Sequence, residues 1–103
     1  IFLVETIFTT ALALTVLHVA TSAKTKSNQY YGLAIGSVLI AGIFAGGPIS
    51  GGVFNPAVVI GTMTVDFANL STNFSNLIIY LVAQFTGGAL AALIFRKTAP
   101  DLK

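Results

Sequence analysis

Asn55, Pro56 and Ala57 are the residues whose types and spacing best suggest chemistry, and they follow the glycine-rich segment 46–52. Asn is a favoured N-cap and Pro is favoured in the first helical turn, so a helix is predicted to begin here. Its N-terminus presents free backbone N–H groups and about half a positive charge, and the Asn55 amide adds further donors. Such a site can hold a water or hydroxyl oxygen while it opposes cations. The simpler interpretation is an ordinary N-cap on a short helix.

Glu5 is a second candidate, because it lies inside an apolar run and Thr9 follows four residues later on the same helix face. A carboxylate within a membrane-spanning helix is costly and requires partners, which makes it a functional candidate. A proton relay is one alternative, although no acid partner is visible in this chain. A position near the membrane interface is another, since Glu5 lies close to the first residue.

His18 is the only histidine, and it lies near Lys24 and away from the Glu5 face. We interpret it as a packing or interfacial residue, with a pH-sensitive gate as the functional alternative. The chain has no cysteine, and its basic residues form no patch that favours nucleic acid. It shows no metal-ligand cluster, nucleophile–base pair or phosphate loop. We therefore expect no enzyme activity, no cofactor and no metal.

The elements that position these residues follow from the charge distribution. Only 8% of the residues are charged, against roughly a quarter in a soluble domain. Three stretches carry no charge at all, namely residues 6–23, 27–65 and 67–95. A bilayer-spanning helix needs about 20 apolar residues, so the first and third stretches each hold one span. The middle stretch is too long for one span and is interrupted at residues 46–52.

The predicted fold is therefore an all-α membrane protein with three transmembrane helices and one re-entrant half-helix. The spans are predicted over residues 1–22, 30–45 and 77–95. Residues 46–52 are not expected to be helical, because they hold four glycines and a proline. The helix that begins at Asn55 and ends near Asp66 is about 16 Å long, half of a hydrocarbon core of about 30 Å. Non-helical backbone at that depth needs protein or water around it, so this loop is predicted to line an aqueous path.

The basic residues predict the orientation. Loop 23–29 carries Lys24 and Lys26, while Arg96, Lys97 and Lys103 lie at the other end of the last span. The positive-inside rule then places loop 23–29 and the C-terminus in the cytoplasm, with the re-entrant segment entering from outside. Two glycosylation sequons begin at Asn69 and Asn73 on that outer side. The chain starts at Ile1 without a charged n-region, so we expect no signal peptide and interpret it as part of a longer protein.

The chain resembles the C-terminal repeat of the aquaporin, or major intrinsic protein, family over nearly all of residues 1–97. The motifs are Glu5-x-x-x-Thr9 and the segments 32–36 (Gly-Leu-Ala-Ile-Gly), 51–57 (Gly-Gly-Val-Phe-Asn-Pro-Ala) and 84–88 (Gln-Phe-Thr-Gly-Gly). The resemblance implies half of a six-span fold, with residues 1–97 as the second inverted repeat and 98–103 as a cytoplasmic tail. It further implies a missing N-terminal repeat and a homotetramer in the lipid bilayer.

The resemblance also implies roles for single residues. Glu5 and Thr9 would support the re-entrant loop, with Glu5 accepting hydrogen bonds from its backbone N–H groups. Asn55, Pro56 and Ala57 would line the pore. Small residues spaced four apart allow helices to approach closely, which predicts packing positions at Gly32, Gly36, Gly87 and Gly88.

The chain departs from the family pattern directly after Ala57, where most members have Arg and this sequence has Val58. The resemblance places Ile43 and Gly52 with Val58 at the narrowest part of the pore, which predicts a less polar constriction. The expected function is a passive channel for water and/or small neutral solutes. The alternatives are a non-conducting structural subunit and an unrelated transporter with a discontinuous helix.

Overall fold

The computed structural model describes residues 1–66 and 70–99, without the side chains of residues 70–73. Within these residues the chain forms four α-helices and no strand, namely α1 (Phe2–Val16), α2 (Tyr31–Ser50), α3 (Pro56–Val65) and α4 (Leu70–Thr98). A π-helical turn over Leu17–Thr21 continues α1, and a short 3-10 helix, Ala23–Thr25, lies in the loop before α2. The sequons at Asn69 and Asn73, and Lys103, lie outside the described part.

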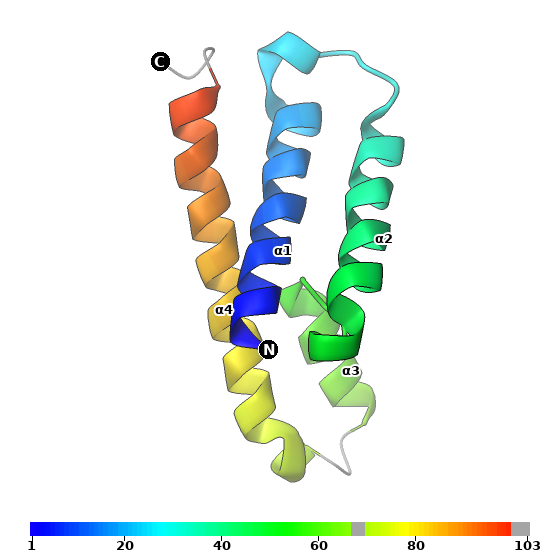
Figure 1. Cartoon of the computed structure of the whole chain (residues 1–103), viewed down its shortest axis with the longest axis vertical. Coiled ribbons are helices and arrows are strands. Elements are labelled where there is room, and N and C mark those ends of the chain that lie inside the picture. Colours follow the sequence, from blue (N-terminus) through cyan, green and yellow to red (C-terminus); the bar gives the residue numbers. More distant parts are fainter. Residues whose placement is uncertain (67–69, 100–103) are drawn as a thin grey trace.

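Three of these helices are long and apolar enough to cross a membrane, over Phe2–Thr21, Tyr31–Ser50 and Phe74–Thr98. They run alternately up and down, and α1 packs mainly against α4 and α2 (Figure 1). The short helix α3 begins about halfway along the bundle, and it also contacts α4. This arrangement confirms the predicted all-helical membrane fold with three long helices and one short one.

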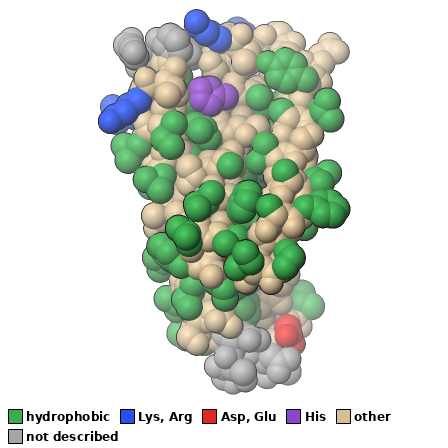
Figure 2. Space-filling model, viewed as in Figure 1, with side chains coloured by type: hydrophobic (Ala, Val, Ile, Leu, Met, Phe, Trp, Pro, Cys, Tyr) green, Lys and Arg blue, Asp and Glu red, His purple; other side chains and the backbone are tan. Residues whose placement is uncertain are grey.

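The two ends of the bundle differ in charge. The loop between α1 and α2 lies at the same end as the last turn of α4 (Figure 1), whereas the end of α3 and the start of α4 lie at the opposite end. Figure 2 shows the basic side chains gathered at the first end, an acidic side chain at the other, and hydrophobic side chains over the surface between them. An exposed apolar surface of this kind suits lipid or further protein.

The prediction that residues 46–52 are not helical is wrong over most of that segment. The helix α2 continues through Gly46, Gly47 and Pro48 to Ser50. Proline removes only one backbone donor, and membrane helices tolerate it where neighbouring protein satisfies the freed groups. The helix ends at Gly51, whose left-handed backbone (φ 89°) lets its N–H bond the Gly47 carbonyl at 2.7 Å. The non-helical turn is thus confined to residues 51–55.

The last helix is longer than the predicted span 77–95, because α4 begins at Leu70 and ends at Thr98. Ser, Thr and Asn in residues 70–76 suggested a turn, yet neither proline nor glycine interrupts the chain before Gly87. Such residues weaken a helix only slightly, so the helix can extend through them.

Candidate functional site

The turn before α3 has an unusual backbone. Gly51, Gly52 and Phe54 all have positive φ angles, of 89°, 67° and 54°. Glycine adopts this region freely, but a bulky residue such as Phe54 is strained there. The Phe54 ring is buried, and its centroid lies 5.5 Å from that of Phe8. Packing of this ring therefore helps to hold the strained turn.

The carboxylate of Glu5 is the second group that holds the turn. It is fully buried, and its Oε1 accepts hydrogen bonds from Phe54 N at 2.9 Å and Gln84 Nε2 at 3.0 Å. Its Oε2 accepts from Ser50 Oγ at 2.6 Å and Val53 N at 3.3 Å. These are the backbone contacts that the family resemblance implied. The Glu5 carboxylate is thus enclosed by protein on all sides.

Ser50, Tyr80 and Gln84 complete this network, and the sequence reasoning assigned a role to none of them. The Ser50 hydroxyl accepts from Gly52 N at 3.2 Å besides donating to Glu5, and the Tyr80 hydroxyl donates to the Ser50 carbonyl. Tyr80 and Gln84 lie four residues apart, on one face of α4. A polar pair at this spacing inside an apolar helix is the signal that could have identified them.

Thr9 makes no side-chain hydrogen bond to the turn within the described residues. Its side chain is buried, but its hydroxyl has no hydrogen-bond partner among the described residues. It packs against α4, since a Cβ built on Gly87 would lie 2.8 Å from Thr9 Cβ. The structure therefore gives Thr9 a helix-packing contact, and the turn is held by Glu5.

Of the four predicted packing glycines, only Gly87 is tightly enclosed within the described chain, with its added Cβ 2.8 Å from the Thr6 carbonyl oxygen. Gly32, Gly36 and Gly88 would meet nothing within 4 Å. The close contacts of α2 are instead made by two other glycines. A Cβ on Gly42 would lie 2.8 Å from the Phe54 ring, and one on Gly46 would lie 2.7 Å from Val4 Cγ1. Gly42 and Gly46 also have the spacing of four, so the pattern was present but did not distinguish the buried pair.

The three residues assigned to the constriction are placed as follows. A Cβ on Gly52 would lie 3.3 Å from Ile43 Cα, so these two residues are in contact. Val58 lies in the first turns of α3 with 47% of its surface exposed, and Ile43 is similarly exposed. Ile43 and Val58 are thus both partly exposed on the surface of this chain.

Asn55 caps α3, and its Oδ1 accepts from Ala57 N at 2.8 Å. Because the oxygen is used for the cap, the Nδ2 group remains to donate outward. Asn55 lies at one end of a groove between α1 and α4, where Phe54, Asn55 and Pro56 meet the two helices. The sides of this groove are Thr9, Leu12, Ala13, Val16 and Leu17 of the first helix, and Gln84, Phe85, Gly88, Ala89 and Ala92 of α4.

His18 lies at the far end of the first helix, in the π-helical turn. Its ring packs edge-on against Phe95 of α4, with centroids 4.9 Å apart and an angle of 82° between the planes. This contact supports the interpretation of His18 as a packing residue.

Comparison with known proteins agrees with this geometry. The family described as Major intrinsic protein matches residues 1–95. The chain is 41% identical over 92 residues to Probable aquaporin TIP2-2 of Arabidopsis thaliana, covering 88% of this chain and 35% of that protein. It is 42% identical over 94 residues to Probable aquaporin TIP3-2 of the same plant (90% and 33%) and 37% identical over 92 residues to Aquaporin TIP2-3 of Zea mays (88% and 35%).

The chain thus spans about a third of the length of these relatives. No solved structure matches it significantly. The family match nevertheless covers almost the whole chain, and three long apolar helices accompany the Asn-Pro-Ala segment that heads α3. The chain therefore belongs to the major intrinsic protein family, the aquaporins, whose members are membrane channels and not enzymes.

Proposed function

We propose that the protein to which this chain belongs is a passive channel for water and/or small neutral solutes, and that this chain forms its second repeat. The observation that carries the proposal is the N-terminus of α3, which Glu5 holds within the bundle through Val53 N and Phe54 N. Its free N–H groups, its dipole and the Asn55 amide can orient an oxygen and oppose cations. Membership of the family supports the same function.

The groove beside Asn55 would accept a helix of the first repeat. Helices pack closely where small residues line the contact, and the groove presents Ala13, Gly88, Ala89 and Ala92. Pro56 and Asn55 lie at one end of it, so a helix in the groove would meet the N-terminus of α3. We propose that Gly32, Gly36 and Gly88 contact the first repeat or another subunit of a homotetramer, since a Cβ added to each would meet nothing within 4 Å among the described residues.

We propose that the loop between α1 and α2 and the end of α4 are cytoplasmic. Lys24 and Lys26 lie in this loop, and Arg96 and Lys97 lie in the last turn of α4 at the same end of the bundle (Figure 1). Asp66 is the C-cap of α3, and the end of α3 lies at the opposite end of the bundle. The positive-inside rule favours this orientation.

The identity of the permeating solute depends on Val58. Valine cannot hydrogen-bond a passing molecule, whereas arginine would bring a fixed charge and five donors. In the full-length protein, Val58→Arg should reduce glycerol flux about tenfold or more and water flux much less, because the added side chain narrows the path. Stopped-flow swelling of proteoliposomes in water and glycerol gradients measures both rates.

Val65→Arg is the matched control, because Val65 lies at the other end of α3 and is 90% exposed. It should leave the ratio of the two fluxes unchanged. An unchanged ratio in Val58→Arg would place the constriction elsewhere. The absence of flux in both the original protein and the variant would support the non-conducting subunit instead.

The role of Asn55 is tested by Asn55→Asp in the same full-length protein. Aspartate caps a helix as well as asparagine does, so the fold should persist while a negative charge replaces the amide donors. We expect the variant to conduct monovalent cations above the lipid background, since the barrier at the α3 N-terminus is weakened. Potassium flux into liposomes measures this effect.

Asn76→Asp provides the control, because it adds the same charge on the exposed start of α4. It should leave the potassium flux at the lipid background. If Asn55→Asp also conducts no cations and passes neutral solutes as before, Asn55 does not act as a filter.

A further inference from the structure

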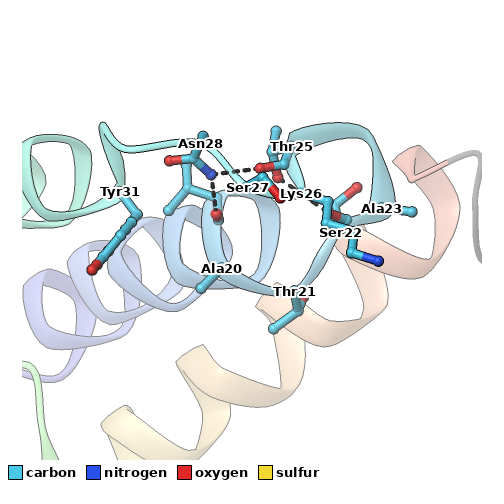
Figure 3. A pocket seen from close by; sticks show the side chains of 10 residues that line it. Ala20, Thr21, Ser22, Ala23, Thr25, Lys26, Ser27, Asn28 and Tyr31 are labelled. Carbon is cyan, nitrogen blue, oxygen red and sulfur yellow. Dashed lines mark hydrogen bonds between the residues drawn. The ribbon is translucent and has the colours of Figure 1, made fainter.

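A polar pocket lies at the opposite end of the first helix from Glu5, beneath the loop that joins it to α2 (Figure 3). The π-helical turn over Leu17–Thr21 forms one side, and Tyr31 at the start of α2 forms the other. The loop is tied back over the end of the helix, because Asn28 Nδ2 donates to the carbonyls of Val19 at 2.7 Å and Thr25 at 2.6 Å. The Thr25 hydroxyl donates to the His18 carbonyl. The pocket is therefore held by side-chain bonds within the loop.

These bonds also decide the charge that the pocket favours. The carbonyl end of a helix repels anions, but here Asn28 and Thr25 cover the carbonyls of Val19 and His18. Among the described residues that line the pocket, Lys26 alone carries a charge, and Ser27 and Tyr31, which also line it, have hydroxyl donors. The carboxylate of Glu5 is bonded to the distant turn before α3. The pocket thus combines a cation with donors that can surround an anionic oxygen.

We propose that this pocket binds the phosphate of an anionic phospholipid headgroup. The phosphate would accept from the Lys26 ammonium and from the Ser27 and Tyr31 hydroxyls, and the negative lipid charge would favour this basic end of the bundle (Figure 2). The inference is independent of the proposed channel function, because lipid binding can be measured without transport.

A lipid suits the position better than a free phosphate does. The pocket is lined by residues of Phe2–Thr21 and by Tyr31, where two of the candidate membrane spans end. Tyr30 and Tyr31 are half-exposed there, as tyrosines at a membrane interface commonly are. Below them, Leu33 and Ile40 of α2 are exposed apolar side chains against which acyl chains can lie. Headgroup and chains can therefore be accommodated together.

The test uses the full-length protein in detergent, titrated with phosphatidylglycerol, phosphatidylcholine or inorganic phosphate. Native mass spectrometry counts bound lipid, and the thermal unfolding midpoint reports stabilisation by each addition. We expect phosphatidylglycerol to bind more tightly than phosphatidylcholine, and inorganic phosphate to produce no comparable shift. Lys26→Gln should weaken phosphatidylglycerol binding about fivefold, since one basic side chain near a membrane surface contributes about that factor.

Lys24→Gln is the matched control, because Lys24 is exposed in the same loop and does not line the pocket. It should bind phosphatidylglycerol like the original protein, whereas Tyr31→Phe should bind it more weakly through the loss of one donor. Equal weakening by Lys24→Gln and Lys26→Gln would overturn the proposal, since it would indicate only a general surface charge. Equal binding of the two lipids, or equal stabilisation by inorganic phosphate, would overturn it as well.

Discussion

Glu5→Leu should abolish most of the folded protein, because it removes the acceptor that joins α1 to the turn before α3 and to α4. Four donors lose their bond in this variant, from Ser50, Val53, Phe54 and Gln84. A buried donor left without a partner costs about 1–3 kcal/mol. We therefore expect a loss of at least about 3 kcal/mol, which is a large part of the usual stability of a small domain. The yield of monodisperse full-length protein in detergent and its thermal unfolding midpoint measure this loss.

Glu5→Gln separates the shape of this side chain from its two acceptor oxygens. The glutamine amide keeps one acceptor and turns two hydrogens toward groups that are themselves donors. The stability of the Glu5→Gln protein should therefore lie between that of the original protein and that of Glu5→Leu. Any Glu5→Leu protein that does fold should transport solutes poorly, since the α3 N-terminus is no longer held in place. Leu3→Ala serves as the control for an exposed position on the same helix and should fold normally. Normal yield and normal transport in Glu5→Leu would contradict the supporting role of Glu5.

Gly87→Ala should be the second most damaging change, because the backbones of α1 and α4 approach each other closely here. The added Cβ would lie 2.8 Å from the Thr6 carbonyl oxygen and 3.1 Å from Thr10 N. These are backbone atoms, so no rotation of a side chain relieves the clash and the two helices must separate. We expect a loss of about 1–3 kcal/mol from overpacking, despite the gain of up to about 1 kcal/mol that alanine brings to a helix. The thermal unfolding midpoint of the full-length protein measures the difference.

Gly61→Ala is the matched substitution, since a Cβ on Gly61 would meet nothing within 4 Å among the described residues. It should leave stability unchanged or raise it slightly. A second test combines Gly87→Ala with Thr9→Gly, which removes the Thr9 Cβ that would lie 2.8 Å from the added atom. This combination should not restore stability, because the Thr6 carbonyl stays in place. Full recovery would show that the side chain of Thr9, and not the backbone, limits the approach.

Local signals in the sequence were sufficient for the class of protein and for the start of α3. Three uncharged stretches predict membrane helices, because charged side chains are too costly in hydrocarbon to be placed there. Three long helices occupy those stretches in the structure. Asn55 and Pro56 predict a helix start from their own capping chemistry, and α3 begins at Pro56. These properties depend on neighbouring residues alone, so they can be read without the fold.

Tertiary contacts decided where α2 ends and which glycines are buried. Residues 46–50 have a composition that opposes a helix, yet they remain helical, with Gly46 against Val4 and Phe54. Both the pair Gly32 and Gly36 and the pair Gly42 and Gly46 have a spacing of four residues. Within the described residues, only the second pair lies close to other elements. The direction in which a helix face points depends on its neighbours, and composition does not contain that information.

The hydrogen-bond partners of Glu5 also depend partly on the sequence alone and partly on the tertiary structure. That a carboxylate in an apolar run needs donors follows from the cost of burying its charge, so the sequence by itself determined that such partners must exist. Which groups donate depends on Ser50 and Gln84, which lie 45 and 79 residues away along the chain. Only the packing of α1 against α2 and α4 brings these side chains within hydrogen-bond distance. Long-range distances of this kind arise from the whole fold, because no local pattern specifies them.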